Sequence, residues 1–470
     1  MADKRVDGFP GWAVTALRRM GYRPGNVMDE HVKAWWSWYQ VDNDFYASDR
    51  LDTGRGGSPE GHLSLRPARM VAEEWASLVM DEKTVIASED DPLNSWLDER
   101  FGDFVGTEAD HLALAFALGT GAWSCDFGLT TDGETLEDAM VRLSWHDAGG
   151  ICPLLSDVDS SVSCAFVDTV LVGGVLLDRL QVHEPVGETR GTYHVRTWLF
   201  GRRNHQVPVA TDSVLPDLDT GSTLPTYALV RPAISNTYQD ACPLGVSVYD
   251  DGIDAIKCVD EAFDRSYWML RLCQPRVIVD ESGLMRDPKT GEPLLGDTID
   301  QKMFRPVRST IDGKSPMTVY APPLGADESD AAINSALSLL SAKCGFGPNY
   351  LSYSRQQGLR TATEVSSDNS QLFRTVRKHE QGVGESLRRL FSGAYSAECA
   401  LRGIVPSSLD VDVRWDDSIV EDTATERALM KDDISRGLAP AWLYPVRYYG
   451  MDEASAKALV GSQQAVPEEA

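Results

Sequence analysis

The sequence has few positive charges for its length. Its 470 residues include 44 Lys and Arg but 71 Asp and Glu, so the formal net charge is -27. A surface with that excess of carboxylates repels nucleic acid unless basic residues gather at one place. Any contact with nucleic acid must therefore depend on a local basic segment.

The sequence also lacks long apolar runs. No run approaches the roughly 20 residues that a helix needs to cross a bilayer. The first residues, MADKRVDGFPGW, lack the apolar core of a secretion signal. With 42% apolar and 24% charged residues, the composition is that of an ordinary globular protein. We expect a soluble chain of two or more compact units that folds in a cytoplasm and contacts no membrane.

Cysteine is scarce and scattered. The eight cysteines form no CxxC pair, and several lie in apolar strings such as SCAFV. This pattern argues against a zinc site or a disulfide framework and favours reduced, buried thiols that act as small core residues. The cysteines are residues 125, 152, 164, 242, 258, 273, 344 and 399.

The motifs of common enzyme classes are missing as well. In DGKS, residues 312–315, the first glycine of a phosphate loop should stand at position 308, where the chain has Arg308. The GTG at 119–121 follows a helix instead of preceding one, and there is no GxSxG or HExxH. We predict no catalytic residue, no metal and no cofactor. Surface or core roles are expected for the histidines without metal-ligand spacing, at 146, 183, 194 and 205.

Two sets of acidic residues leave an enzyme open as an alternative. Asp410, Asp412 and Asp416 could serve a metal-dependent hydrolase, and Asp157 and Asp159 form a similar pair. Such alternation on a strand or turn is also what a solvated face produces, and this is the interpretation that we favour. Metal binding that is lost in Asp-to-Asn variants would support the hydrolase.

Periodicity divides the first half into helical and β segments. Helical spacing appears in MDEHVKAWWSWYQ, in PARMVAEEWASLVMDE and, from about residue 108, in TEADHLALAFALG. The tryptophans of the first stretch could stack bases or sugars, but such a cluster is more often core. From about 121 to 230 the period is two, with Gly, Asp and Ser between the runs, as in an antiparallel sheet. The fold class is therefore α+β.

The second half has an unusual order of elements. A helical stripe from Ile253 to Leu270 is followed by a Pro- and Gly-rich segment with short strands and then by a second stripe from Ile333 to Ala342. A Gly-rich break, GFGPNYLSYSRQQG, leads to a capping box, TATE at 361–364, which opens a helix that runs to about residue 400. A half-buried strand, SLDVDVRWDDS, and a second TATE box at 423–426 follow.

This order resembles the portal proteins of tailed bacteriophages, the head-to-tail connectors, and most closely those of long-tailed phages of Gram-positive hosts. The most specific stretch is GFGPNYLSYSRQQGLRTATEVSSDNSQLFRTVRKHE. The likeness extends to VAEEWASLVMDEKT, ICPLLSDVDSSVSCAFV, GVSVYDDGIDAIKCVDEAFDRSYWMLRLCQPRVIV and VRWDDSIVEDTATERALMKDDISRGL. Together these stretches span most of residues 65–450.

The resemblance implies a portal fold that assembles into a ring oligomer. Its expected parts are an N-terminal wing, helical and then antiparallel β, over 1–250; two stem helices over 251–275 and 326–344; a small β-rich clip over 276–325; a tunnel loop over 345–360; a long wing helix and wing strand over 361–420; and a small helical crown and tail over 421–470.

The resemblance also implies a function. Portals form closed rings of about twelve copies at a single capsid vertex of the virion, after assembly in the host cytoplasm. Double-stranded DNA passes through the ring without sequence specificity, inward during packaging and outward during ejection. The expected partners are other copies of the chain, the major capsid protein or scaffold, the terminase large subunit and the head-completion adaptor protein. Another structural ring of the tail is an alternative, against which the clip between paired helices argues.

Candidate site residues follow from the same resemblance. The tunnel loop and its flank would present to DNA Tyr353, Arg355, Gln356, Gln357 and Arg360. The clip would bind partner proteins through Arg286, Lys289, Glu292, Lys302 and Arg305. In the long helix, the residues expected to pair with acids of a neighbouring subunit are Arg374, Arg377 and Lys378.

The local charge agrees with a channel through which DNA slides. Between residues 355 and 389 there are seven basic and four acidic residues, so this segment is positive within an acidic chain. DNA carries one charge per roughly 1.7 Å, and every neutralised phosphate adds affinity, so few and spaced basic positions let the duplex move. The alternative is a solvated helix face whose ion pairs contribute little.

Overall fold

The computed structural model describes residues 6–463 apart from residues 7, 26–27, 48–61, 82, 128–139, 156–162, 188–190, 210–214, 240–241, 274–275, 281–287, 290–303, 308–316, 321–322, 324, 354–361, 416–429, 450 and 452. Within elements, the backbone alone is described at 271–272, 276–280, 304–307, 317–318, 320, 362–370, 453–454 and 461–463.

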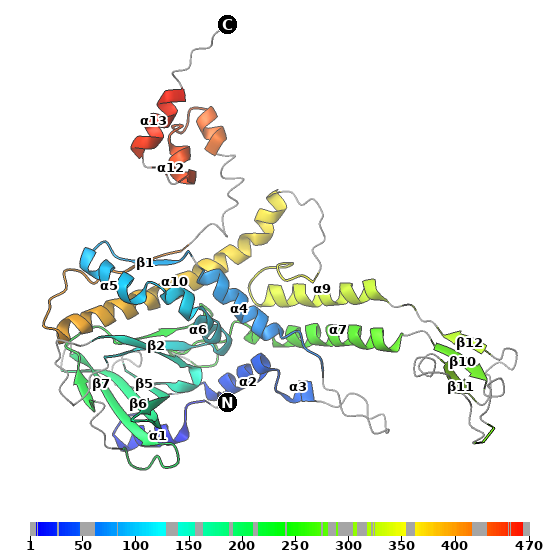
Figure 1. Ribbon diagram of the computed structural model, residues 1–470, viewed down its shortest axis with the longest axis horizontal. Coiled ribbons are helices and arrows are strands. Elements are labelled where there is room, and N and C mark those ends of the chain that lie inside the picture. Colours follow the sequence, from blue (N-terminus) through cyan, green and yellow to red (C-terminus); the bar gives the residue numbers. More distant parts are fainter. Residues whose placement is uncertain are drawn as a thin grey trace, which may run out of the picture.

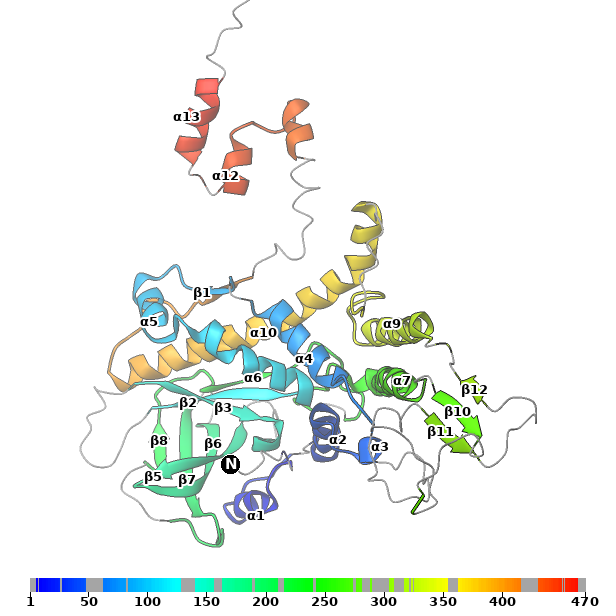
Figure 2. The same cartoon turned by 45° about the vertical axis from the view of Figure 1, so that its right-hand side comes forward.

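A mixed body of helices and sheets carries two projections (Figures 1 and 2). A pair of helices, α7 and α9, leads from the body to a small sheet, and the C-terminal helices lie apart from the body. The body helices are α1 (Gly11–Arg19), α2 (Asp29–Gln40), α3 (Asp44–Ala47), α4 (Pro67–Val79), α5 (Asp91–Phe101), α6 (Phe104–Leu118) and α10 (Ala362–Leu401).

Three helices of the first 120 residues, α2, α4 and α6, form where the sequence predicts them, whereas α1, α3 and α5 were not predicted. α4 begins at Pro67, whose fixed φ suits the first helical position. α6 begins at Phe104, four residues before the expected start, and ends at Gly119, which has the positive φ that favours glycine. Trp35 of α2 is buried, so the tryptophan cluster belongs to the core, and base stacking by this residue is excluded.

Antiparallel sheets follow over the predicted range. One sheet has the order β3-β2-β9, with β2 at Gly121–Asp126, β3 at Arg142–Asp147 and β9 at Tyr227–Val230. The other has the order β4-β5-β6-β7-β8, and its strands are β4 (Ile151–Pro153), β5 (Cys164–Val172), β6 (Val175–Val186), β7 (Thr192–Gly201) and β8 (Asp217–Asp219).

The β5–β6 hairpin turns at Gly173 and Gly174, both with positive φ. Glycine at both central positions is what a tight turn between twisted strands requires.

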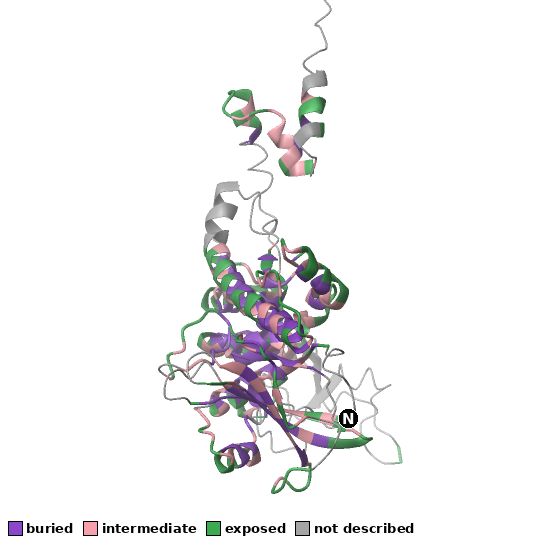
Figure 3. Cartoon of the chain, turned by 90° about the vertical axis from the view of Figure 1, so that its left-hand side faces the viewer, coloured by how far each residue is buried: buried purple, intermediate pink, exposed green. Residues whose placement is uncertain are grey.

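The N-terminal segment, which lies outside the stretches that carry the resemblance, contributes α1 and α2 to the body. α1 packs on the five-stranded sheet through Ala13, Ala16 and Leu17, against Leu180 and Phe200 among others. α2 lies in the larger core, which also includes α4, α6 and α10. Figure 3 shows this burial concentrated between the sheets and α10.

The helix pair and its insertion also match the sequence prediction. α7 spans Ile253–Leu272 and α9 spans Ala326–Lys343. Between them lies a sheet of order β11-β10-β12, with β10 at Arg276–Asp280, β11 at Phe304–Val307 and β12 at Met317–Tyr320. β11 is parallel to β10, whereas β12 is antiparallel to it.

α10 crosses the body and packs against β9, α4, β13 and β2. Val383, Leu387 and Leu390 are buried, as expected from their helical spacing. Gly393 permits a close approach, since a Cβ there would lie 2.0 Å from the carbonyl oxygen of Pro225. After α10, β13 (Asp412–Arg414) forms within the stretch where the sequence predicts a half-buried strand. It pairs with β1 (Val85–Ala87). The structure describes no side chain of the two capping boxes or of Val365.

The C-terminal helices α12 (Leu443–Tyr449) and α13 (Glu453–Gln463) pack on each other. The rings of Tyr444 and Tyr448 lie 4.9 Å apart in a tilted arrangement, and Lys457 lies over the ring of Trp442. Pro445 and Ala456 are buried here.

The cysteine prediction is confirmed for most thiols and wrong for one. All eight are free, and five are buried, with Cys242 and Cys273 half-buried. Cys258 is exposed, because its position on α7 faces away from the neighbouring helices.

A buried arginine joins the two sheets of the body. Arg179 on β6 makes a bidentate pair with Asp168 of β5 and also pairs with Asp126 of β2. Its side chain is only 7% exposed. Burial lowers the pKa of such a group, but the two carboxylates together raise the pKa of Arg179 above its usual value, so it stays charged.

We expect Arg179→Met to lower the free energy of unfolding by about 3 kcal/mol, because two part-buried carboxylates lose their counter-charge. Arg414→Met, which removes an exposed partner of Asp412, should cost less than about 1 kcal/mol. Urea unfolding of both variants measures the difference. Equal losses would contradict the role given to Arg179.

Candidate functional site

The helix pair α7–α9 is antiparallel and close. At one end, Gly252 just before α7 lies against Cys344 just after α9. A Cβ added at Gly252 would lie 2.8 Å from Cys344 Sγ. At the other end, Ser329 Oγ of α9 lies 3.6 Å from Met269 Sδ of α7. The two helices therefore run side by side along their length, and the insertion sheet sits at their far end (Figure 1).

Two buried carboxylates attach the N-terminal chain to α7. Asp260 accepts hydrogen bonds from Tyr46 Oη at 2.6 Å, Ser64 Oγ at 2.7 Å and the Leu65 amide at 2.8 Å. Asp264, one turn later, accepts from the Leu63 amide. Burial raises the pKa of Asp260, and these donors offset part of that rise. The base of the pair is thus fixed to the body.

The start of α7 has a second anchor in Asp250. One oxygen of this carboxylate accepts from Trp35 Nε1 at 2.6 Å, and the other accepts from Tyr238 Oη at 2.7 Å. Tyr249, fully buried beside it, donates to the Trp35 carbonyl oxygen. α2 and the start of α7 are therefore held together by polar contacts as well as by packing.

Both helices of the pair keep apolar side chains exposed. Leu270 of α7 is 54% exposed and Leu339 of α9 is 48% exposed. Ala342, expected in the buried stripe of α9, is exposed, because the buried side of this helix is centred on Leu337 and Leu340. A single copy of the chain therefore leaves apolar parts of the pair uncovered.

The exposed charge of the helix pair is mainly acidic. Among described side chains here, the basic residues are Lys257, Arg265 and Lys343. Lys257 is paired with Asp254. The exposed acidic residues at α7 and α9 are Asp251, Asp254, Glu261, Asp327, Glu328 and Asp330.

The chain after α9 is anchored to α4 before it reaches the expected tunnel residues. Phe346 is stacked between Trp75, with ring centroids 4.3 Å apart, and Tyr350, at 5.0 Å. Tyr350 Oη donates to Glu74, and Trp75 Nε1 donates to the Cys344 carbonyl oxygen. The first part of the 345–360 segment thus belongs to the body.

Of the predicted tunnel residues, only Tyr353 is described. Its side chain is 59% exposed, and its amide donates to Asn334 Oδ1 of α9 at 2.8 Å. The other four, from Arg355 to Arg360, lie outside the described residues. Of the predicted clip residues, Lys289 is exposed, and the side chains of the rest are not described.

The three basic residues predicted on the long helix are exposed. Arg374, Arg377 and Lys378 all lie on the solvent side of α10. Arg377 and Lys378 form no ion pair with any residue that the structure describes, whereas Arg389 on the same helix pairs with Glu385. Pairing with a neighbouring copy remains a prediction.

His379, beside this basic group, is a core residue. It is 1% exposed and lies against Trp75 and Phe116. Its Nδ1 accepts a hydrogen bond from the Ala233 amide at 3.0 Å. Burial lowers the pKa of His379 to about 4, with a smaller effect of neighbouring Lys378.

The residues of the hydrolase alternative lie on a solvated face. Val411 and Val413 point into the core, while Asp410 and Asp412 are exposed. Asp412 pairs with Arg414 at 3.0 Å, and Asp416 is outside the described residues. Over the described chain, no three His, Cys, Asp or Glu side chains are placed to hold a metal ion. Nor does any described helix have the length and apolarity needed to cross a membrane.

The histidines of the β region are held by neighbouring side chains. His146 lies 2.8 Å from Ser124 Oγ, and His183 lies 2.7 Å from Thr226 Oγ1. Burial lowers the pKa of His146 to about 4 and that of His183 to about 3. His205 stacks on Trp12.

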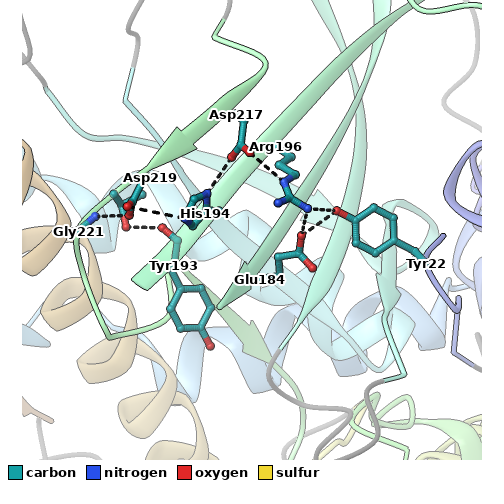
Figure 4. A network of polar contacts seen from close by, with 9 residues as sticks. Tyr22, Glu184, Tyr193, His194, Arg196, Asp217, Asp219 and Gly221 are labelled. Carbon is teal, nitrogen blue, oxygen red and sulfur yellow. Dashed lines mark hydrogen bonds and ion pairs between the residues drawn. The ribbon is translucent and has the colours of Figure 1, made fainter. Parts of the chain in front are cut away.

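His194 belongs to a polar network on the sheet (Figure 4). Its Nδ1 lies 2.9 Å from Asp217, which also accepts from Arg196 Nε at 3.1 Å. Arg196 in turn donates to Tyr22 Oη at 2.9 Å, and Tyr22 donates to Glu184. Burial raises the pKa of Tyr22 to about 12, so it remains a donor. The network ties β6, β7 and β8 to the end of α1.

Comparisons with known proteins add little. No family model and no curated protein matches the chain. A solved structure described as "Neck of native GTA particle computed with C12 symmetry" contains a chain that is 10% identical, with a TM-score of 0.41, over 96% of this chain and 98% of that one. A likeness this weak carries no argument about fold or function.

The sequence interpretation missed the carboxylates that anchor α7. Asp250, Asp260 and Asp264 were assigned no role, because their hydrogen-bond donors include residues of distant segments, which helical periodicity does not reveal. The signal was present, since Asp260 and Asp264 lie four and eight residues after buried Ile256, on the same side of the helix.

The buried imidazoles predict that acid weakens the fold. Below pH 6.5 the unfolded chain binds protons on these side chains, but the folded chain does so only near pH 4, so stability falls as pH drops between these values. Each imidazole contributes up to about 1.4 kcal/mol per pH unit. Asp29 and Asp260, whose pKa is raised, act in the opposite direction at the acidic end.

His379→Gln keeps an acceptor for Ala233 and should flatten this pH dependence. Melting temperatures recorded at pH values from 7.5 to 5 measure this pH dependence. Gln371→Asn, an exposed position of the same helix without a titrating group, serves as the control and should leave the slope unchanged. An unaltered slope in His379→Gln would contradict the neutral core role of this residue.

Proposed function

We propose that the chain is a portal-like subunit of a phage or phage-derived particle, which assembles into a closed ring whose channel conducts double-stranded DNA. The observation that carries the proposal is the antiparallel pair α7–α9 with a three-stranded sheet at its far end, followed by the long helix α10. In this assignment the pair is the stem, the small sheet is the clip and the body is the wing.

The charge of the pair supports a channel. A duplex moves through a pore only where the wall does not hold its phosphates. The stem helices expose mostly carboxylates, and Lys257 is occupied by Asp254. A basic contact with DNA would then fall to the 354–361 segment, next to exposed Tyr353.

The uncovered apolar side chains support a ring. Leu270 and Leu339 project from the stem of a single copy, and a heterologous contact repeated around a closed axis would cover them. In the virion, at a single capsid vertex, the clip would meet the terminase and later the adaptor protein, and the outer body would meet the capsid protein or scaffold. About twelve copies are expected. C-terminal residues 421–470 would form a small crown.

The proposal predicts a large, closed particle in solution. Light scattering of the purified chain should give a mass near twelve times 51.6 kDa, and negative-stain images should show rings with a central hole. A compact monomer that stays monomeric in the presence of scaffold and capsid protein would contradict it.

A charge reversal tests the channel assignment separately. Arg355→Glu should leave ring assembly intact but reduce the amount of packaged DNA, because a carboxylate in the lumen repels phosphate. Arg18→Glu, at an exposed position of α1, should affect neither property. Particles assembled with each variant are compared by DNA content. Normal packaging by Arg355→Glu would contradict the assignment of Arg355 to the lumen.

A further inference from the structure

The exposed face of α10 is basic. Of the exposed charged side chains that the structure describes on this helix, only Glu385 is acidic, and it is paired with Arg389. Arg377, Lys378 and Arg388 form no ion pair with any residue that the structure describes. In a chain with a net charge of -27, this helix face therefore carries positive charge without a counter-charge among the described residues.

These basic residues share one side of the helix. Arg377 and Arg388 are eleven residues apart, which is three helical turns, so they lie in line about 16 Å from each other at 1.5 Å per residue. Lys378 lies next to Arg377 on the same exposed side, while Val383 and Leu387 take the buried side. Arg377, Lys378 and Arg388 are called the α10 basic stripe below.

α5 exposes the opposite charge. Asp91, Asp98 and Glu99 of this helix and Asp103, just after it, are exposed. None of these four carboxylates forms an ion pair with a residue that the structure describes. The one Lys or Arg of α5 and α6 is Arg100, and it is paired with Glu398 of α10. The four carboxylates are called the α5 acidic face below.

The two charged surfaces cannot meet within one copy. α5 lies beside α10 (Figures 1 and 2), and the rings of Trp96 and Tyr395 are 5.2 Å apart across this contact. Trp96 belongs to the buried side of α5. Asp91 and Asp98 lie on the other side of the helix from Trp96, so their side chains point away from α10.

We infer that the α10 basic stripe of one copy docks on the α5 acidic face of the next copy. The two surfaces have opposite charge, and neither is neutralised by described residues of its own copy. They are also similar in length, since Asp91 and Glu99 are about 12 Å apart along α5. Two different surfaces that complement each other are what a head-to-tail contact requires.

This inference rests on the proposed ring and names residues of one subunit interface. Copies with a charge of -27 repel each other on average, so a contact between them has to bring basic residues of one copy to acidic residues of the other. Single exposed ion pairs contribute little. The contact would therefore add to the burial of Leu270 and Leu339 that the ring requires.

A charge swap on the full-length chain tests the contact. The α10 variant carries Arg377→Glu and Lys378→Glu, and the α5 variant carries Asp98→Lys and Glu99→Lys. Each variant places like charges across the contact, so the protein concentration for half-assembly, measured by light scattering, should rise about tenfold or more. The combined variant, with all four changes, restores opposite charges and should assemble as the unmodified chain does.

Two controls separate the contact from general effects of charge and folding. Arg18→Glu with Arg203→Glu changes the net charge as much as the α10 variant does, at exposed positions that form no ion pair with described residues. This control should assemble normally and, when added to the α5 variant, should not restore assembly. Melting temperatures of all variants should stay close to that of the unmodified chain, because the changed side chains are exposed.

Salt gives a second readout of opposite sign. Raising the salt concentration from about 0.1 M to about 1 M shortens the screening length from about 10 Å to about 3 Å. Assembly of the unmodified chain should weaken over this range, because attraction across the contact is screened. Assembly of the α10 variant should strengthen, because repulsion is screened instead.

The outcomes separate this inference from the proposed ring. Rings that form normally in both double variants, or a defect of the α10 variant that the combined variant does not repair, would overturn the contact and leave the ring standing. Normal assembly of the α10 variant with lost binding of a labelled DNA duplex would assign the stripe to DNA and overturn the contact. Open chains that obey the swap would support the contact and contradict the ring. An unmodified chain that never associates at low salt contradicts both.

Discussion

The buried face of α10 is the constraint on which the rest of the structure depends. Val383, Leu387 and Phe391 of this helix are fully buried, and β9, α4 and β13 pack against it. Polar contacts fix the approach of the neighbours, as when Ser386 Oγ donates to the Leu229 carbonyl oxygen. Glu398 near the helix end accepts from Arg100 of α5 and from the Val141 amide. The positions of β2, β9, α4 and β13 therefore depend directly on this helix.

The anchoring of α7 then connects the body to the stem. Buried carboxylates are costly unless donors surround them, and Asp250 and Asp260 each have donors from chain segments far away in sequence. A stem fixed in this way moves with the body as one unit.

Periodicity predicted the elements well where one face is buried and the other is solvated. The stripe of α9 apart from Ala342, the strand at Val411 and Val413, and the order of helix, insertion and helix agree with the structure. Periodicity failed where polar side chains are buried. Asp260 and His379 look like solvated residues in the sequence, yet partners from distant segments bury them. The contact between β9 and α10 was also not predictable, because its residues, such as Leu229 and Ser386, lie 157 residues apart in the sequence and no local pattern records their contact.

The central claim is that copies of α7 and α9 surround a hole that admits a duplex. A cryo-electron microscopy reconstruction of the assembled protein tests it most directly. The account predicts a closed ring of about twelve copies, with both helices on the wall of the channel and the three-stranded sheets together at one mouth. A closed ring with α7 and α9 on its outer surface, or an assembly without a central channel, would contradict the account.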